Sequence, residues 1–497
     1  MTWIYKEKLQ QTLPFLIFGG FAGYVASTMN WHLAAIIMSA ILIVLTIATL
    51  RPTWFLYLFV CIIFIIEEYP SVIAENGRWI RTPFYAKSIG IPGLYAYDFF
   101  FIFALMMFIL YLLNRQMRPA LPVGLIPSLL FFLSALLLST TISLIDKMAA
   151  PPVLNYDIST LGFEFHGSAI KLIAFAQTKT FLYLFLTAIA LFMVCFTRHR
   201  LYMMITTVGI SIIITIFIGL YRLFLSPTLI TNQGIPLFYD TASSMAFLLI
   251  VLSVVVVQML QIRISLPLKF IIWTIALLAA IMIALSFRRT VWLCAFLILG
   301  WLFFQLGSKE AFFRKIFAVI ALGAAVLLIM NIAGINIVPK GVEQRIKATT
   351  LKESSTLYRF LIYKNAFKVI NDAPLIGHGI APLWNYQIVQ GKFRQTYENV
   401  HSLYLWLLFR WGIIGFVGFI WILRHFFARG IQLLHKKDIS LNDKAIVLVA
   451  LYGMAGFLVT AAFFPVYGMI RFMMMMGLLI AIVERIHVLY NKKTRMW

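Results

Sequence analysis

Long apolar runs constrain this chain more than any other feature of its sequence. A transmembrane helix needs about 20 predominantly apolar residues to cross roughly 30 Å of hydrocarbon, and the sequence offers many such runs. They predict an all-α polytopic integral membrane protein with about 12 to 14 spans. The expected spans are 13–30, 32–50, 53–67, 95–113, 122–145, 178–197, 201–225, 240–262, 268–286, 290–306, 315–337, 401–423, 446–464 and 467–484.

Composition excludes a soluble globular domain. Hydrophobic residues make up 62% of the chain, charged residues 12%, and the mean hydropathy is +0.95. The three cysteines (Cys61, Cys195 and Cys294) all lie in apolar runs, which is typical of buried thiols and not of a disulfide or metal set. No cleavable signal peptide is expected, because the first apolar run leads into a second one.

Basic residues predict the orientation in the membrane. If the N-terminus is cytoplasmic, every second connection is basic, including 424–444, as the positive-inside rule requires. Both termini and the tail after 484 then lie in the cytoplasm. Much of the +24 net charge comes from these basic residues on the cytoplasmic side, so the sequence predicts no nucleic-acid partner.

The segment 339–400 is predicted as an outer loop between an N-terminal membrane region (1–338) and C-terminal spans with a cytoplasmic tail (401–497). It carries nine basic and four acidic side chains, a net charge of +5. Long loops are partly exempt from the orientation rule. The loop is therefore either a solvated basic face or an electrostatic funnel for an anionic substrate.

An amphipathic helix is expected within this loop. Ser354-Ser355-Thr356 is a plausible N-cap, and Asn371-Asp372-Ala373-Pro374 ends the pattern. Arg359 and Lys364 lie on its polar positions, available to lipid head groups. The following Gly-His-Gly predicts a turn, in which His378 is either a turn residue without a further role or a second substrate contact.

Arginines gather at the outer ends of the expected spans. An arginine in hydrocarbon costs at least about 2.5–3.5 kcal/mol, so it usually has a partner or a function. Carboxylate partners within the spans look scarce, since Asp98 and Asp240 lie at span edges. Each arginine could reach the interface alone, but together they favour an anion site, because a guanidinium binds phosphate through two parallel hydrogen bonds. The candidates are Arg222, Arg288, Arg289, Arg410 and Arg471.

The stretch ENVHSLYLWLLFRWGIIG (398–415) places His401 where this hydrophilic loop meets a span. An imidazole at that depth can meet a lipid-borne head group and a water-borne partner together. His401-Ser402, nine residues and then Gly412-x-x-Gly415 resemble the signature of bacterial O-antigen ligases. The segments FRRTVWL and STLYRFLIYKNAFKVINDAPLIGHG resemble the neighbouring parts of the O-antigen ligase/polymerase superfamily. The resemblance covers roughly 286–420.

This resemblance implies a metal-independent glycosyltransferase without a cofactor, acting on the outer face of the bacterial inner membrane. The donor would be a glycan on undecaprenyl pyrophosphate, and the acceptor a sugar hydroxyl of lipid A–core or of another glycan. His401 would act as base. Arg288 or Arg289 would bind the pyrophosphate with support from Arg222 and Arg359, and Lys364, His378, Arg410 and Arg471 could add further contacts.

Two alternatives stay open at this point. A repeat-unit polymerase uses the same chemistry, and sequence separates it poorly from a ligase. A non-enzymatic transporter of lipid-linked sugars would be expected to have repeated halves with polar residues near the midplane. The sequence has no evident internal repeat, and its polar residues gather at one face.

Overall fold

The structure is a computed structural model of the 497-residue chain. It describes residues 52–66, several positions between 97 and 109, and 124–145, 170–195, 197–225, 240–286, 289–306, 354–379, 387–390, 393–396, 400–464, 466 and 469–491. The expected spans 13–30, 32–50 and 315–337, most of 95–113, and the loop positions 339–353 lie outside the described residues.

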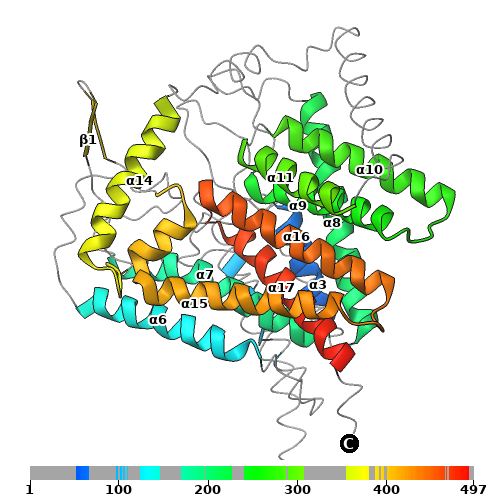
Figure 1. Cartoon of the computed structure of the whole chain (residues 1–497), viewed down its shortest axis with the longest axis horizontal. Helices are drawn as coiled ribbons and strands as arrows, with labels where there is room; N and C mark the ends of the chain where they lie inside the picture. Colours follow the sequence, from blue (N-terminus) through cyan, green and yellow to red (C-terminus); the bar gives the residue numbers. More distant parts are fainter. Residues whose placement is uncertain are drawn as a thin grey trace, which may run out of the picture.

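The described part is a bundle of apolar helices (Figure 1). Its helices are α3 (Pro52–Ile65), α6 (Ile126–Ile145), α7 (Ile170–Val194), α8 (Arg198–Leu225), α9 (Thr241–Met259), α10 (Leu266–Leu285), α11 (Arg289–Leu306), α14 (Ser354–Asp372), α15 (Leu403–Leu434), α16 (Leu441–Phe463) and α17 (Ile470–Asn491). Among the described residues, the six helices α8, α9, α10, α15, α16 and α17 are long and apolar enough to cross a membrane. The prediction of a helical, polytopic membrane protein is confirmed.

A short hairpin was not predicted. Strands β1 (Gln387–Gln390) and β2 (Phe393–Thr396) pair antiparallel, with Gln387 opposite Thr396 and Gln390 opposite Phe393. The expected outer segment therefore contains both the helix α14 and this hairpin.

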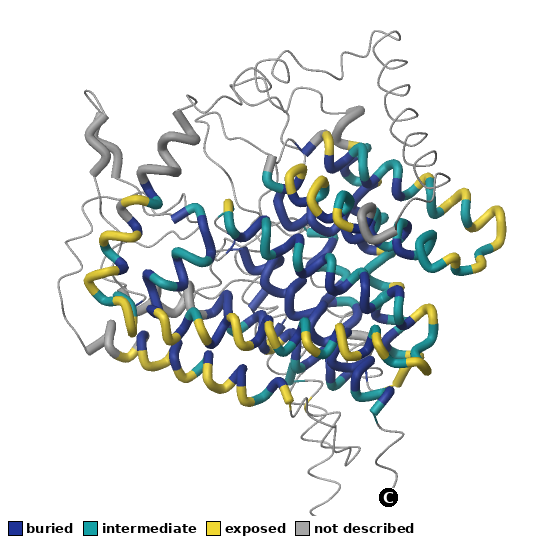
Figure 2. Tube along the Cα trace, in the orientation of Figure 1, coloured by how far each residue is buried: buried dark blue, intermediate teal, exposed yellow. Residues whose placement is uncertain are grey.

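Helix α17 forms the centre of the bundle. It lies against α7, α15 and α16, and nearly all of its side chains are buried (Figure 2). Its backbone approaches α7 closely at Gly477, where a Cβ atom would stand 2.5 Å from the carbonyl oxygen of Leu184. Exposed apolar side chains instead cover α10 and α11, among them Phe270 and Phe296. These are the faces that lipid would cover.

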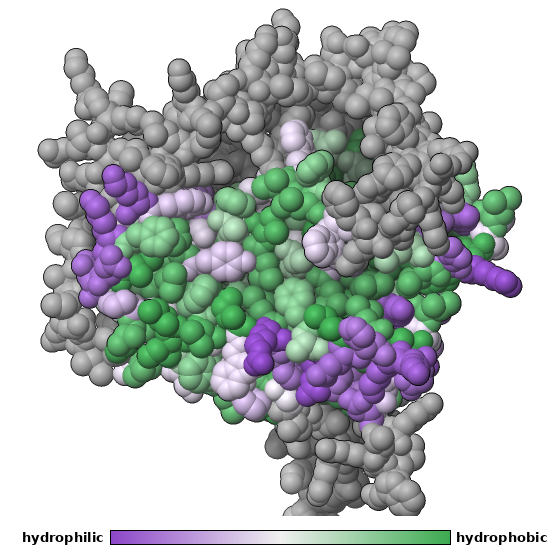
Figure 3. Space-filling view, viewed as in Figure 1, coloured by the Kyte–Doolittle hydropathy of each residue, from purple (hydrophilic) through white to green (hydrophobic). Residues whose placement is uncertain are grey.

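Polar surface collects at the ends of the bundle. In Figure 3 one hydrophilic patch lies over α14 and another over the region where α15 ends and α16 begins, with an apolar belt between them. Asp443 organises the second region: its carboxylate accepts hydrogen bonds from Tyr202 (2.9 Å) and Tyr490 (2.7 Å) and pairs with Arg198 (3.1 Å). Helices α8, α16 and α17 are thus joined at the end predicted to face the cytoplasm.

Candidate functional site

Helix α15 is broken inside the motif that the sequence analysis singled out. Gly412 has φ +61° and ψ −164°, so 403–411 and 413–434 are two helical segments. Figure 1 shows them meeting at an angle beside α14. The sequence predicted a continuous span over 401–423. The structure corrects this: the helix breaks at Gly412 and extends to Leu434.

The turn 374–379 docks into this break and satisfies the backbone groups that the break releases. We call the two segments, 374–379 and 409–414, the glycine clamp. Backbone hydrogen bonds join them in both directions: His378 N–H to Phe409 O (2.8 Å), Gly379 N–H to Arg410 O (2.9 Å), Ile413 N–H to Pro374 O (2.8 Å) and Ile414 N–H to Leu375 O (3.2 Å). Buried amides need such partners in an apolar surrounding. The break in α15 therefore depends on the turn that follows α14.

Glycine is required on both sides of the clamp. A Cβ atom on Gly412 would stand 2.3 Å from Leu375 O, and one on Gly377 would stand 2.5 Å from Gly412 N. Both residues have positive φ, +61° and +74°, which other L-residues rarely adopt. Gly415 is close to the break too, since a Cβ there would lie 2.3 Å from Trp411 Cβ. The paired glycines of the motif thus have a conformational reason.

Replacing Gly412 by alanine is expected to destabilise the protein and lower transfer activity. The added methyl group meets backbone atoms of the turn, and the positive φ costs about 1–3 kcal/mol by itself. The measurement is the amount of folded protein that survives heating in detergent. The matched control is Gly300→Ala in α11, where a Cβ meets nothing within 4 Å. Equal thermal stability of the two variants would contradict the clamp.

His401 lies just before the first segment of α15. The Tyr363 hydroxyl of α14 donates a hydrogen bond to the His401 carbonyl oxygen (2.9 Å). The ring atom Nδ1 is shielded from solvent, while the residue as a whole is partly exposed. Ser402 is the N-cap residue of α15, but its side chain makes no capping hydrogen bond. Helix α14 therefore contributes to the position of His401.

Apolar packing reinforces the contact between α14 and α15. Three consecutive turns of α14 present Ile362, Ala366 and Ile370, all buried, to Val400 and Phe409. On its other side the first segment of α15 rests on aromatic rings: Trp406 stacks on Phe181 of α7 (5.4 Å between centroids), and Trp411 meets Phe181 edge-on (4.6 Å). The Ser139 hydroxyl of α6 also donates to the Arg410 carbonyl oxygen (2.8 Å). The segment that follows His401 is therefore held from two sides.

Helix α16 links this site to the beginning of α11. The Tyr404 hydroxyl donates to Leu458 O (2.9 Å), and the Cys294 thiol donates to Gly456 O (3.3 Å). Tyr404 comes three residues after His401, and Cys294 comes five residues after Arg289, a rise of about 7.5 Å along a helix. His401 and Arg289 are thus brought to the same end of α16.

The predicted pyrophosphate arginines are placed only through their backbones. Arg289 is the first residue of α11, and Arg222 lies in the last turn of α8. Arg359 precedes Tyr363 by four residues, so both positions lie on one face of α14. Arg288 itself, and the side chains of these three arginines, lie outside the described residues. Their convergence on a pyrophosphate stays a prediction.

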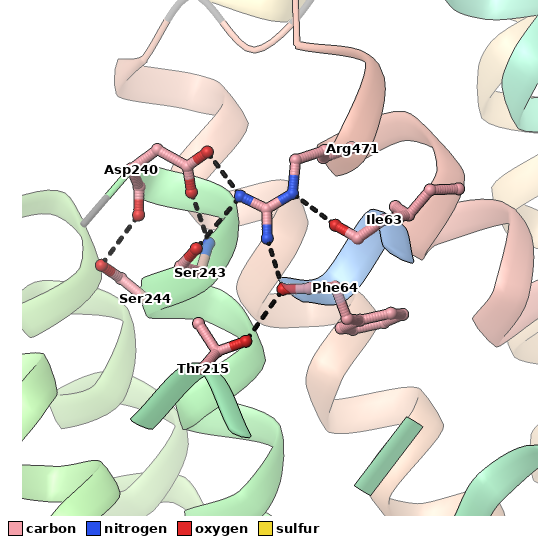
Figure 4. A network of polar contacts seen from close by, with 7 residues as sticks. All are labelled: Ile63, Phe64, Thr215, Asp240, Ser243, Ser244 and Arg471. Atoms are coloured by element: carbon pink, nitrogen blue, oxygen red, sulfur yellow. Dashed lines mark hydrogen bonds and ion pairs between the residues drawn. The ribbon is translucent and has the colours of Figure 1, made fainter. Parts of the chain in front are cut away.

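Arg471 corrects one expectation, that carboxylate partners are scarce. It is fully buried and its Nη1 donates to Asp240 Oδ2 (2.6 Å) and to Ser243 Oγ (3.1 Å) (Figure 4). Its Nε and Nη2 donate to the carbonyl oxygens of Ile63 (2.6 Å) and Phe64 (2.8 Å). Because Asp240 is also the N-cap of α9, the network joins α3, α9 and α17. Arg471 thus has a structural role that the sequence did not indicate.

The remaining candidates differ in their surroundings. Arg410 is buried, with 2% of its surface exposed. Its Nη1 donates a hydrogen bond to Gly379 O (3.2 Å), and its guanidinium carbon lies 4.7 Å from the centre of the Phe409 ring. Arg410 therefore belongs to the glycine clamp. His378 Nε2 donates to Val369 O (2.7 Å), which anchors the turn to the end of α14. Lys364 is exposed on α14. Substrate contacts of all three stay predictions.

Two features of the site were missed in the sequence. Tyr363 and Ser139 form contacts to backbone carbonyls of α15, 38 and 271 positions away in the chain, and no local pattern marks them. The pairing of Gly-His-Gly with Gly412 could have been suspected, since two glycine motifs flanking one loop can allow backbones to approach closely. Among the described residues, no group of three His, Cys, Asp or Glu side chains comes together as metal ligands.

The comparison with protein families matches the part of the chain that contains this site. The family model described as O-antigen ligase matches residues 274–420, which begin within α10 and include α11, α14 and the first part of α15. The match confirms the resemblance to the O-antigen ligase/polymerase superfamily over these residues. His401, Tyr363 and both halves of the glycine clamp lie inside it. No curated protein matches the chain.

Proposed function

We propose that the protein transfers a glycan from undecaprenyl pyrophosphate to a sugar hydroxyl of a lipid acceptor, on the outer face of the bacterial inner membrane. The observation that carries the proposal is the placement of His401. It is held at the start of a broken helix by α14, inside the matched domain, at the same end of the bundle as the start of α11.

His401 is assigned the role of base. The acceptor oxygen attacks the anomeric carbon of the donor sugar, and its proton passes to the imidazole. The bond from that carbon to the pyrophosphate oxygen breaks, and undecaprenyl pyrophosphate leaves. Because Nδ1 of His401 is shielded, Nε2 is the nitrogen that we assign to the proton.

The negative charge that gathers on the leaving pyrophosphate needs preorganised cations. We assign this role to Arg288 or Arg289 at the start of α11, with Arg222 and Arg359 in support. A planar guanidinium can bind two phosphate oxygens through two parallel hydrogen bonds in a fixed geometry, whereas a lysine acts as a point charge. The support for this assignment is the common end of α16 at which α11 and α15 begin.

The orientation in the membrane belongs to the same proposal. Both termini are assigned to the cytoplasm, and the site to the periplasm, because the basic connections alternate along the sequence. The hydrophilic patches at opposite ends of the bundle are consistent with this (Figure 3).

The glycan profile of a deletion strain tests the function. A ligase predicts that polymer disappears from the lipid acceptor while long undecaprenyl-linked chains accumulate. Single repeat units left on the acceptor would instead indicate the polymerase of the same superfamily. Unchanged products together with a lost flux of lipid-linked sugar across the membrane would contradict an enzyme and favour a transporter.

A further inference from the structure

Helix α14 and the turn that follows it contact both ends of the short segment that follows His401. At one end the Tyr363 hydroxyl donates to the carbonyl oxygen of His401 itself (2.9 Å). At the other end the turn 374–379 binds the carbonyl oxygens of Phe409 and Arg410 through the N–H groups of His378 and Gly379. Since the clamp turn follows α14 directly, one unit of the structure, 354–379, holds residues 400–411 at both limits.

The usual device that fixes the start of a helix is missing here. An N-cap serine normally accepts a hydrogen bond from a first-turn amide through its side chain, but the Ser402 side chain makes no such bond. Its backbone is extended, with φ −153° and ψ 127°; its N–H donates to Val400 O (2.6 Å), and its carbonyl oxygen accepts from Trp406 N–H (3.0 Å). The carbonyl group of His401 is thus held by a contact from outside its own helix, the Tyr363 hydroxyl.

We propose that Tyr363 is a positioning residue for the His401 base. Its hydroxyl holds the carbonyl oxygen of the residue whose ring must meet the acceptor, and so sets the direction of the Cα–Cβ bond that carries the imidazole. The inference rests on the function proposed above, in which His401 takes the acceptor proton. Tyr363 touches neither donor nor acceptor in this role and acts through His401 alone.

The packing explains why Tyr363 can do this. It lies beside the buried row of Ile362 and Ala366, which fixes the rotation of α14 about its axis against Val400 and Phe409. Tyr363 itself is only partly buried. Removing its hydroxyl leaves the ring and the apolar row in place, so the packing of α14 survives while the hydrogen bond is lost.

Tyr363→Phe tests the proposal in the full-length protein reconstituted with lipid-linked donor and acceptor. We expect kcat to fall by about tenfold, because small misplacements of a catalytic group are costly, with KM for the donor unchanged within about twofold. The melting temperature should match the wild type. The matched control is Tyr57→Phe, which also loses a hydrogen bond from its hydroxyl to a backbone carbonyl oxygen (Arg200 O, 3.3 Å). Arg200 lies in the first turn of α8, at the end of the bundle predicted to face the cytoplasm. The kcat of this variant should stay at the wild-type value.

Three results would overturn the proposal. Wild-type kcat in Tyr363→Phe would remove the positioning role, and so would a kcat that falls only in step with melting temperature. A rise in KM at unchanged kcat would assign Tyr363 to substrate binding. Failure of the proposed function is distinguishable: a fully active His401→Ala protein overturns the base itself, whereas an inactive His401→Ala protein with normal Tyr363→Phe activity overturns only the positioning role.

Discussion

Replacing His401 by alanine is expected to abolish glycan transfer while leaving the protein folded. General base catalysis contributes about 10²- to 10⁴-fold to a rate, so the variant should fall to the limit of detection in cells. The fold should persist because the bond from Tyr363 goes to the His401 backbone, which alanine retains. The measurement is the glycan profile of the deletion strain complemented with the variant, with expression checked in the membrane fraction.

Two further variants sharpen the result. His401→Gln keeps a hydrogen-bonding side chain but cannot accept a proton at neutral pH, and it should be as inactive as alanine. His435→Ala serves as the matched control, because this histidine is exposed at the far end of α15, where its Nδ1 lies 2.8 Å from Ile431 O one turn earlier in the chain. Normal polymer from a stably expressed His401→Ala protein would remove the base assignment.

The largest effect on stability is expected at Asp240. Removing one partner of a buried ion pair leaves an uncompensated charge and costs about 3–5 kcal/mol. Arg471 is completely buried, and Asp240→Ala would take away both its carboxylate partner and the N-cap of α9. We therefore expect a large loss of thermal stability, measured as the protein that remains monodisperse after heating in detergent.

Asp240→Asn separates the two contributions. An amide oxygen can still accept from Ser243 N–H, so the cap is retained while the negative charge next to Arg471 is lost. Its stability should fall between that of the wild type and that of Asp240→Ala. The control is Asp438→Ala, an exposed carboxylate in the connection between α15 and α16, which should be neutral. Melting of Asp240→Ala at the wild-type temperature would show that the pair in Figure 4 does not stabilise the fold.

Local signals in the sequence predicted α14 well. The serine and threonine cluster at 354–356 and the stop before Pro374 predicted a helix to about 370, and the helix spans Ser354–Asp372. These signals act within a few residues of the helix ends, so they need no knowledge of the fold. The same is true of the apolar runs, whose length alone identifies spans.

The end of α15 was predicted eleven residues too early, because its charged residues were taken as a loop. In the structure two side chains of this stretch contact α17: His425 Nε2 lies 2.9 Å from Glu484 Oε1, and Arg429 Nη1 lies 2.8 Å from His487 Nε2. Polar side chains that meet partners on a neighbouring helix are compatible with a continuous span. The periodicity of one helix does not reveal such partners.

The break at Gly412 could not be predicted for a related reason. A Gly-x-x-Gly pattern in an apolar run is equally compatible with close packing of an unbroken helix. The positive φ arises only because the turn 374–379 supplies hydrogen-bond partners for the released backbone groups. The pairing of Arg471 with Asp240, 231 positions apart, is likewise a product of the tertiary fold.

The most direct test of the account is transfer by the purified protein in proteoliposomes supplied with an undecaprenyl-pyrophosphate-linked glycan and a lipid acceptor. The account predicts that the wild-type protein forms the glycosylated acceptor and releases undecaprenyl pyrophosphate in equal amounts, and that the folded His401→Ala protein forms neither. Equal product formation by the two proteins would contradict the account. So would a folded wild-type protein that transfers no glycan and instead moves the lipid-linked donor across the bilayer.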